Sequence, residues 1–331
     1  MASNSETLVT VFGGSGFLGR NVVRALCRRD YRVRVAVRRP ELAGYLQPSG
    51  RVGQVHTIQA NLRYPASVEA ALNGASAAIN LVGVKSEHGA QTYDAVHVEG
   101  ARAIAQGAAA RNIPLVHLSG IGADADSASP YIASKGRGEA AVKEAAPGAI
   151  VLRPSVVFGP EDEFFNRFGL LARYSLALPL FGGGVTKLQP VFVGDVAQAA
   201  VQAAEGAATA GATYELGGPE VMTLRQIVEF VCQTTGRRRI FLDVPFGPAS
   251  LMARMTEIAQ SLSFGAFPKA LVTTRDQIEL LRRDNVVSAE AVAQGRTLTG
   301  LGITPEGVEA ITPAYLYRFR KSGQFANSRL A

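Results

Sequence analysis

A glycine-rich run at residues 13–19 constrains this chain of 331 residues more than any other feature. The run reads Gly-Gly-Ser-Gly-Phe-Leu-Gly and follows residues 7–12, a short apolar and β-branched segment typical of a buried strand. It precedes residues 17–29, where apolar side chains recur at helical spacing without proline. The glycines therefore lie at a strand-to-helix turn, the context in which this spacing predicts a dinucleotide-binding site.

Each glycine of this turn has a predicted role. Gly13 permits the tight turn, Gly16 lets the backbone approach a pyrophosphate, and Gly19 lets the helix pack closely on the strand. The helix N-terminus offers free N–H groups and the positive end of its dipole to the phosphates. The candidate cofactor-binding residues of the turn are Gly13, Gly14, Ser15, Gly16, Phe17, Leu18 and Gly19. The alternative is a glycine turn that binds nothing.

Two arginines mark the end of the second predicted strand, residues 31–37. An acidic residue near this position commonly holds the ribose 2′-hydroxyl of the adenosine. This chain has Arg38 and Arg39 there and no acid. A carboxylate would repel a 2′-phosphate, whereas a guanidinium binds one bidentately. The sequence therefore favours NADP(H) over NAD(H), the alternative being that both arginines belong to a generally basic surface.

Segments typical of strands and helices alternate through the first half of the chain. Expected strands cover residues 54–59, 77–81, 115–118 and 149–153, and expected helices cover residues 40–46, 65–73 and 92–112. This alternation predicts an α/β fold with a doubly wound parallel sheet of Rossmann type and a smaller, mostly helical C-terminal region. We expect residues 1–160 to form the NADP(H)-binding domain, completed by about 188–216. Residues 161–187 and 217–331 would form the smaller substrate or partner region.

Ligands of such a sheet bind at the carboxyl ends of its strands. Residues after the third strand usually flank the adenine in this fold class, which makes Asn61 and Leu62 candidates; the alternative is an ordinary asparagine turn. Val82 and Gly83 end the fourth strand and extend the predicted cofactor site.

Ser119, Tyr131 and Lys135 form the candidate catalytic set. Tyr131 and Lys135 are four residues apart and share one helix face, while Ser119 ends an earlier strand. The serine would orient a carbonyl or alcohol, and the tyrosine would give or take the proton. The lysine would favour phenolate and hold the nicotinamide ribose, so Tyr131 and Lys135 also belong to the predicted cofactor site. A second pair with this spacing, Tyr317 and Lys321, lacks that context and is interpreted as accidental.

Charge and composition exclude several classes of protein. The net charge of +7 predicts anionic partners, but no nucleic-acid-binding motif accompanies it, so we expect no nucleic acid. The two cysteines, Cys27 and Cys232, and the four histidines show no spacing typical of a disulfide framework or a metal site. No apolar run is long enough for a bilayer, and the first strand starts too early for a signal peptide. These features predict a cytoplasmic protein.

Several motifs together resemble those of the extended, or atypical, short-chain dehydrogenase/reductases. They are the glycine turn, the set of Ser119, Tyr131 and Lys135, the stretch from Arg153-Pro154 to Gly159-Pro160, and Val193-Gly194-Asp195. The resemblance implies that Pro154, Ser155, Val156 and Val157 border the nicotinamide.

A narrower resemblance is to the group of the nucleotide-binding accessory subunit nine of respiratory complex I and its bacterial homologues. The stretches that carry it are residues 159–168, 189–196, 274–277, 281–287 and 315–325. The resemblance implies a link to quinone and respiratory metabolism, a structurally bound nucleotide and little turnover. It also implies partners in a membrane-bound respiratory complex or in the quinone pathway, since a related branch is associated with coenzyme-Q biosynthesis.

The chain departs from the pattern of extended enzymes at three places. His97 stands where they usually carry asparagine, and Phe158 replaces the tyrosine of the Arg-Pro motif. The loop from Ser119 to Tyr131 is shorter than in sugar-nucleotide epimerases, which argues against a bulky nucleotide sugar. Three functions stay open: an NADP(H)-binding subunit-nine-like protein with slow or no catalysis, an active NADPH-dependent reductase of a small carbonyl or quinone-like compound, and an NADP(H)-sensing regulator.

Two segments predict contact with an anionic membrane surface. Residues 315–321 interleave aromatic and cationic side chains, a pattern suited to the headgroup level. Residues 248–267 carry an apolar stripe of Leu251, Met252, Met255, Ile258, Leu262, Phe264 and Phe267. We expect peripheral, salt-sensitive association with the cytoplasmic face of the inner membrane, directly or through a partner. The alternative is a core helix followed by a solvated basic tail.

Overall fold

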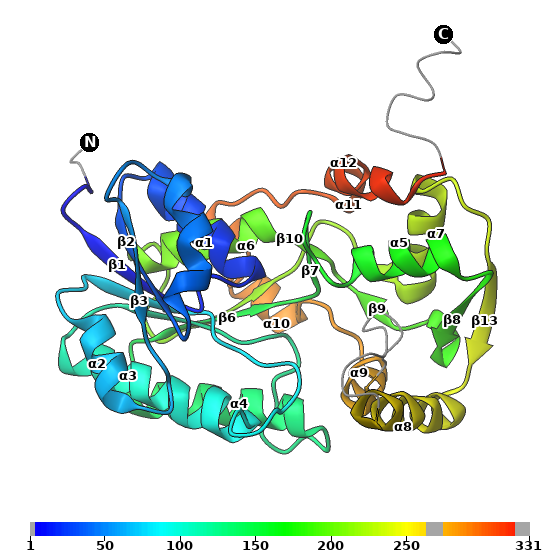
Figure 1. The fold of residues 1–331 in the computed structure, drawn as a ribbon, viewed down its shortest axis with the longest axis horizontal. Coiled ribbons are helices and arrows are strands. Elements are labelled where there is room, and N and C mark those ends of the chain that lie inside the picture. Colours follow the sequence, from blue (N-terminus) through cyan, green and yellow to red (C-terminus); the bar gives the residue numbers. More distant parts are fainter. Residues whose placement is uncertain (1–3, 263–273, 322–331) are drawn as a thin grey trace, which may run out of the picture. The chain divides into compact units, whose positions relative to one another are not determined.

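The computed structural model describes residues 4–262 and 274–321 (Figure 1), and the chain divides into two compact units. The first unit comprises Met1–Pro154, Val193–Leu216 and Val287–Pro305. The second comprises Ser155–Phe192, Gly217–Val286 and Glu306–Ala331. The chain passes from one unit to the other several times, so neither unit is one continuous segment.

A seven-stranded parallel sheet forms the centre of the first unit, in the order β11-β6-β5-β4-β1-β2-β3. Its strands are β1 (Leu8–Phe12), β2 (Arg32–Val37), β3 (Val55–Gln59), β4 (Ala77–Asn80), β5 (Leu115–Leu118), β6 (Ile150–Pro154) and β11 (Thr213–Leu216). Because β1 pairs with β2 on one side and with β4 on the other, the strand order reverses beside β1. This is the doubly wound arrangement, and the predicted fold class is confirmed.

Helices cover both faces of this sheet. Figure 1 shows α1 (Phe17–Arg28) and α6 (Val193–Ala204) on one face, and α2 (Pro65–Leu72), α3 (Gly100–Ala110) and α4 (Pro130–Ala145) on the other. Within β1, Val9, Val11 and Phe12 are all buried, because a parallel strand between two helical layers has no face open to water. The carboxyl ends of the strands are thereby held at one rigid edge.

The sheet edge differs from the sequence prediction. β11 was not assigned, and residues 287–305, with α10 (Ala289–Ala293) and the 3₁₀ turn Thr299–Leu301, belong to the first unit rather than to the smaller region. The Glu215 N–H donates to the Arg296 carbonyl at 3.0 Å, and the Ser288 N–H donates to the Glu215 carboxylate at 2.7 Å. These bonds connect the outer edge strand β11 to residues 288 and 296, which are distant in the sequence. The compact units change at residues 154 and 193, beside the predicted 160 and 188.

Short strands accompany the helices expected in the second unit. α5 (Phe165–Tyr174) and α7 (Leu224–Thr234) share a core with α11 (Val308–Ile311), α12 (Pro313–Leu316) and the turn Tyr317–Phe319. β8 (Ala177–Phe181) pairs with β13 (Ile240–Val244), β7 (Val157–Phe158) with β10 (Val191–Phe192), and β9 (Lys187–Leu188) with β12 (Met222–Thr223). α8 (Phe246–Leu262) and α9 (Arg275–Leu280) enclose a small separate cluster.

Two predicted α-helices take other forms. Residues 40–49 are a 3₁₀ helix, η1 (Pro40–Ser49), which contains Pro48, a residue that cannot donate a bond of an α-helix. The long helix expected at 92–112 begins as a π-helix, η2 (Asp94–Glu99), and becomes α-helical only in α3. π-Helical turns are rare and frequently occur at functional sites.

The C-terminal segment of residues 315–321 is partly buried and partly exposed. Tyr315, Leu316 and Phe319 are buried in the core of the second unit, and an added β-carbon on Gly169 would lie 2.5 Å from the nearest atom of the Phe319 ring. The Tyr315 hydroxyl donates to the buried Asp162 carboxylate at 2.7 Å. Two of the three aromatic side chains of residues 315–321, Tyr315 and Phe319, therefore pack in the core, whereas Tyr317 is exposed; contact of this segment with a membrane stays a prediction.

The apolar stripe of residues 248–267 is only partly described. On α8, Leu251, Met252 and Met255 are exposed, whereas Phe264 and Phe267 lie outside the described residues. Within the described ranges, no helix has both the length and the hydropathy needed to cross a bilayer.

Candidate functional site

The glycine turn after β1 has the backbone that its sequence predicts. Gly13 has a φ of +77°, in the left-handed region that favours glycine, and its N–H donates to the Ala36 carbonyl at 3.1 Å. The Gly16 N–H donates back to the Gly13 carbonyl at 3.1 Å. The turn is therefore tied to the end of β2, next to Arg38.

Gly16 and Gly19 differ in what surrounds them. An added β-carbon on Gly19 would lie 2.6 Å from the Gly14 Cα and closer still to the Gly13 carbonyl oxygen, so α1 packs directly on the turn. The same atom on Gly16 would only reach ordinary contact, 3.4 Å from the Gly13 oxygen, and Gly16 is exposed. The protein itself leaves space at Gly16, as a bound pyrophosphate would require.

The N-terminus of α1 is also suited to phosphate. Gly16 is its N-cap, no side chain caps it, and no acidic residue lies in its first turn. Leu18 is buried in the unit, so its side chain packs while its backbone lies at the helix start. An uncapped helix N-terminus presents backbone donors and a positive dipole end to an anion.

Tyr45 covers one side of this turn, and sequence reasoning missed it. Its hydroxyl donates to the Ser15 carbonyl at 2.6 Å, and the Arg20 guanidinium lies 5.4 Å from the centre of its ring. A tyrosine inside a 3₁₀ helix thirty residues downstream carries no sequence signal of this contact. The contact fixes the Ser15 peptide and adds a cation beside the turn.

Arg38 and Arg39 follow β2 as predicted but have different surroundings. Both are exposed, and the Arg39 Nε donates to the Glu41 carboxylate at 3.0 Å. Arg38 has no hydrogen-bond or ion-pair partner within the described part of the chain. Of the two candidate phosphate ligands, Arg38 is the one with a guanidinium that no carboxylate engages.

Asn61 and Leu62 lie after β3 with their side chains already engaged. The Asn61 Oδ1 accepts from the Arg63 N–H at 3.2 Å, which is a local asparagine turn, and the Ser67 hydroxyl bonds the Asn61 backbone. Leu62 is buried, and an added β-carbon on Gly100 would lie 2.8 Å from its Cβ. The adenine role of Asn61 stays a prediction.

The carboxyl end of β4 meets the glycine turn and the candidate lysine. An added β-carbon on Gly13 would lie 3.2 Å from the Val82 N, and one on Gly83 would lie 3.4 Å from the Lys135 Nζ. The buried Asn80 orients this end, since its Oδ1 accepts from the Val82 N–H at 3.1 Å. The structure therefore brings together the predicted residues Gly13, Val82, Gly83 and Lys135.

His97, on the π-helix η2, links the loop after β4 to the start of α4. Its Nε2 accepts from the Val84 N–H at 2.9 Å, and its Nδ1 lies 2.8 Å from the Ser134 hydroxyl. The Ser134 hydroxyl in turn donates to the Tyr131 carbonyl at 2.7 Å. Because Nε2 accepts, a neutral His97 carries its proton on Nδ1 and donates it to Ser134.

An aromatic cluster surrounds the predicted proton donor. The Tyr131 ring stands edge-on to His97 at 5.8 Å and edge-on to Tyr93 at 5.7 Å, while Tyr93 stacks on His97 at 5.6 Å. Such contacts restrict the ring orientations. Thus His97, which replaces the usual asparagine, holds both the backbone and the ring environment of Tyr131.

Lys135 has an electrostatic environment suited to proton exchange. Burial lowers its pKa to about 8, and the nearby Glu139 opposes that shift. Glu139 is itself held by Arg153, with bonds of 2.9 and 2.7 Å. Burial and the positive charge of Lys135 lower the pKa of both His97 and His117 to about 3, so both histidines are neutral at physiological pH.

Ser119 lies at the end of β5, where its N–H donates to the Leu152 carbonyl at 2.8 Å. Its hydroxyl is buried and has no hydrogen-bond partner among the described residues. Buried hydroxyls are almost always bonded, and each exception needs an explanation. The predicted chemistry supplies such an explanation, because the oxygen atom of a bound substrate would accept a hydrogen bond from this hydroxyl.

The predicted nicotinamide-bordering residues are divided between the units. Pro154 ends β6 in the first unit, where its carbonyl accepts from the Ile121 N–H at 3.1 Å. Ser155, Val156 and Val157 begin the second unit. There the Ser155 hydroxyl donates to the Asn285 Oδ1 at 2.6 Å, and Val157 pairs with Val191. Their predicted role stays a prediction.

A match to a known family agrees with this arrangement. Residues 9–217 match the NAD dependent epimerase/dehydratase family, and this stretch contains the glycine turn, Ser119, Tyr131 and Lys135. The chain belongs to that family. Members of the NAD dependent epimerase/dehydratase family bind a nicotinamide dinucleotide, which confirms the predicted class of cofactor.

Two relatives of known name match this family member, one over nearly all of its length and the other over about half. It is 31% identical over 326 residues to subunit 9 of the NADH dehydrogenase [ubiquinone] 1 alpha subcomplex of Arabidopsis thaliana, covering 97% of this chain and 80% of that protein. It is also 35% identical over 181 residues to the ceramide reductase of Caulobacter vibrioides, covering 54% of this chain and 56% of that protein. The predicted resemblance to the subunit-nine group is confirmed.

Solved structures share the family fold. Gox2253 superposes with a TM-score of 0.69 at 22% identity, covering 94% of this chain and 98% of that one. The UDP-glucose 4-epimerase of Thermotoga maritima superposes with a TM-score of 0.68 at 17% identity, covering 95% of this chain and 98% of that one.

Among the described residues there is no cluster of histidine, cysteine and carboxylate side chains that could hold a metal ion.

Proposed function

We propose that this protein binds NADPH at the glycine turn and reduces a carbonyl group with Ser119, Tyr131 and Lys135. The observation that carries the proposal is the buried Ser119 hydroxyl, which has no hydrogen-bond partner in residues 4–262 and 274–321. Leaving such a group unbonded costs free energy, and a substrate carbonyl oxygen at Ser119 removes that cost. If the nucleotide were bound only for structure, no substrate oxygen would accept a hydrogen bond from this hydroxyl, and the cost of leaving it unbonded would remain.

The residues divide the chemistry between them. A bound nicotinamide dinucleotide supplies the hydride. Ser119 donates a hydrogen bond to the carbonyl oxygen, and Tyr131 gives that oxygen the proton. Lys135, with a pKa of about 8, retains its proton at neutral pH and can replace the one lost by Tyr131. His97 keeps Tyr131 oriented through Ser134.

The preference for NADPH rests on Arg38. Its unpaired guanidinium follows β2, and no acidic residue stands at that position to bind a ribose 2′-hydroxyl. We expect calorimetric titration to show tighter binding of NADPH than of NADH. Arg38→Gln should remove most of the difference, because a hydrogen bond to a charged group contributes about 1.5–3 kcal/mol. Arg39→Gln is the matched control, since Glu41 already pairs with Arg39. Equal affinities in the unmodified protein would disprove the preference.

A kinetic experiment tests the reductase proposal. NADPH oxidation is followed with carbonyl and quinone-like acceptors for the unmodified protein, Ser119→Ala and Tyr131→Phe. We expect both variants to lose turnover while nucleotide affinity changes little. The rate should fall as the pH rises through about 8, where Lys135 loses its proton. Absence of NADPH oxidation with every acceptor class, or a Tyr131→Phe variant with full activity, would contradict the proposal.

A second function is favoured by the relatives that span 96–97% of this chain, which are complex I subunits. In this alternative the chain is a nucleotide-binding partner of a quinone-linked respiratory assembly at the cytoplasmic face of the membrane, with little turnover. Affinity purification from detergent-solubilised membranes, followed by mass spectrometry, tests it. Enrichment of respiratory-complex or quinone-pathway proteins supports the alternative, and their absence argues against it.

A further inference from the structure

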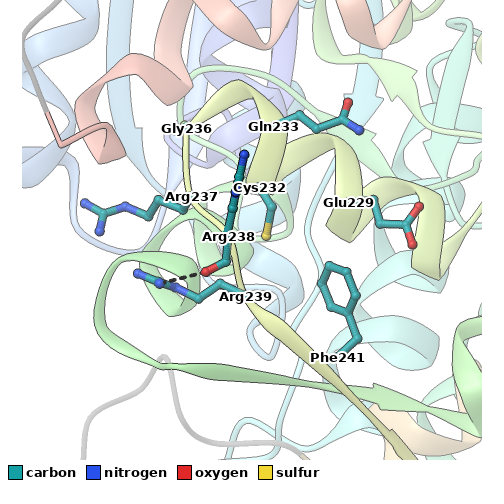
Figure 2. Close-up of a pocket in the computed structure, with 8 residues that line it drawn as sticks. All are labelled: Glu229, Cys232, Gln233, Gly236, Arg237, Arg238, Arg239 and Phe241. Atoms are coloured by element: carbon teal, nitrogen blue, oxygen red, sulfur yellow. Dashed lines mark hydrogen bonds between the residues drawn. The ribbon is translucent and has the colours of Figure 1, made fainter.

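The turn between α7 and β13 carries a pocket of about 450 Å³ within the second unit (Figure 2). Three consecutive arginines, Arg237, Arg238 and Arg239, line it together with Glu229, Cys232, Gln233, Gly236 and Phe241. The dinucleotide site described above involves none of these residues. The pocket therefore needs an explanation of its own.

No carboxylate of the described residues forms an ion pair with the arginines around this pocket, although Glu229 is among the residues that line it. Burial lowers the pKa of Arg237, and the nearby positive charges of Arg239 and Arg173 lower it further. Arg320 adds a further cation, since its Nε donates to the Thr234 carbonyl at 2.8 Å. Within the described residues, none of these arginines or Arg238 forms an ion pair. By contrast, arginines elsewhere pair with acids, as in Arg111–Glu69, Arg153–Glu139 and Arg225–Asp243.

Backbone carbonyls hold two of the guanidinium groups in place. The Arg237 Nε donates to the Phe319 carbonyl at 2.8 Å, and the Arg239 Nε donates to the Ala172 carbonyl at 2.7 Å. Figure 2 shows both guanidinium groups on the side of the turn opposite Glu229. These bonds satisfy carbonyls at the end of α5 and at Phe319, but they use only part of each guanidinium.

Donors remain at the pocket after these contacts. In the described structure, the Nη2 atoms of Arg237 and Arg239 have no protein acceptor, and the Arg238 guanidinium has none at any nitrogen. Bonds to carbonyls of α5 and of Phe319 account for both Nε atoms, but they account neither for the free Nη2 donors nor for Arg238. Fixed, unneutralised guanidinium groups are the usual recognition elements for phosphate, which they bind bidentately.

We propose that this arginine pocket binds a phosphate ester. The phosphate would lie against Arg238 and the free Nη2 donors, and Phe241 and Cys232 would contact its carbon-bearing part. Three exposed apolar side chains lie on β13, which also carries Phe241, or next to it: Ile240 and Leu242 on β13, and Leu176, whose carbonyl accepts from the Ile240 N–H at 3.2 Å. The same chemistry is offered by a phospholipid headgroup and by a soluble phosphate ester, and the exposed side chains suit the first source.

The test uses the full chain saturated with NADPH, so that the dinucleotide site does not compete. Binding is measured with inorganic pyrophosphate by calorimetry, and with phosphatidylcholine vesicles containing 30% phosphatidylglycerol by co-sedimentation. The test variant is Arg173→Gln/Arg238→Gln, because neither guanidinium donates a hydrogen bond within the described structure. The matched control is Arg24→Gln/Arg28→Gln, which removes the same charge from exposed positions on α1.

We expect the test variant to bind vesicles about 25-fold more weakly, since each cation near an anionic surface contributes about fivefold, whereas the control stays near the unmodified protein. Pyrophosphate binding should fall at least tenfold in the same variant. If the ligand is a phospholipid, Ile240→Ser/Leu242→Ser should weaken vesicle binding and leave pyrophosphate binding unchanged. If the ligand is a soluble phosphate ester, this variant should change neither vesicle binding nor pyrophosphate binding. Equal effects of the test and control variants, or no binding of either probe by the unmodified protein, would overturn the proposal.

Discussion

At the scale of single residues, two glycines of one turn serve different requirements. Gly19 has no space for a β-carbon because the Gly13 and Gly14 backbone lies against it. Gly16 is exposed and has the space, so only a bound pyrophosphate would require glycine there. The difference separates what the fold needs from what the ligand needs.

This difference predicts opposite behaviour of two alanine variants. Gly19→Ala should destabilise the protein by about 1–3 kcal/mol, the usual cost of overpacking, because α1 must move from the turn. Gly16→Ala should retain its stability in urea but lose NADPH affinity. Urea denaturation and calorimetric titration of both variants check this. A Gly16→Ala variant that binds NADPH normally would show that the pyrophosphate does not lie there.

The residues of the site were predictable to different degrees. The roles of Gly13 and Gly19 follow from spacing, because a strand-to-helix turn admits few backbone paths. Lys135 was found from its spacing to Tyr131, but its lowered pKa depends on burial, which spacing does not reveal. Tyr45 carries no local signal, because its contact with Ser15 depends on how η1 folds back over the turn.

At the scale of elements, the π-helix η2 determines how two loops meet. Its position in place of regular α-helix places His97 between Val84 and Ser134. The histidine thereby connects the end of β4 to the first turn of α4. An asparagine, the usual residue of extended enzymes here, has only one short amide to reach both Val84 and Ser134. The departure to histidine therefore allows one side chain to bond both loops.

His97→Ala should therefore loosen this connection. The Val84 N–H loses its acceptor, and we expect a loss of stability of about 1–3 kcal/mol, the range for a buried group left unbonded. Ser134→Ala, which keeps the Val84 bond, should cost less, about 0.5–1.5 kcal/mol. Urea denaturation and amide hydrogen exchange at Val84 measure both. His56→Ala, at an exposed position on β3, is the control and should change neither.

The elements that sequence reasoning missed depend on distant partners. β11 has only four residues, and its identity as a strand follows from pairing with β6 and from the bond between Glu215 and Arg296. The burial of Tyr315 and Phe319 could not be predicted, because a buried aromatic and a lipid-facing aromatic give the same local pattern. Only Gly169, which leaves room for the Phe319 ring, distinguishes them.

At the scale of the whole molecule, the C-terminal segment is part of the second unit's core. A chain that ends at Ile311 loses Tyr315, Leu316 and Phe319, all of which are buried. Removal of a large buried side chain costs about 2–5 kcal/mol, so we expect this truncation to unfold the second unit. A chain that ends at Lys321 keeps all three and should remain folded.

Circular dichroism, limited proteolysis and NADPH titration of the two truncated chains check this prediction. Membrane release of the shorter chain without any loss of stability would support the lipid-facing interpretation of the segment. Loss of stability in both chains would show that residues beyond Lys321 contribute to the fold.

The discontinuity of the first unit also has a consequence for synthesis. Its last segment, Val287–Pro305, is hydrogen-bonded to β11 at the sheet edge, yet it is translated long after β6 and after most of the second unit. At about 5–20 residues per second, the ribosome needs many seconds between the emergence of β6 and that of the segment that completes the sheet. During that interval the incomplete edge is open to chaperones, to the nucleotide and to other emerging chains. The dinucleotide-binding unit is therefore completed after translation has passed through most of the second unit, rather than before it.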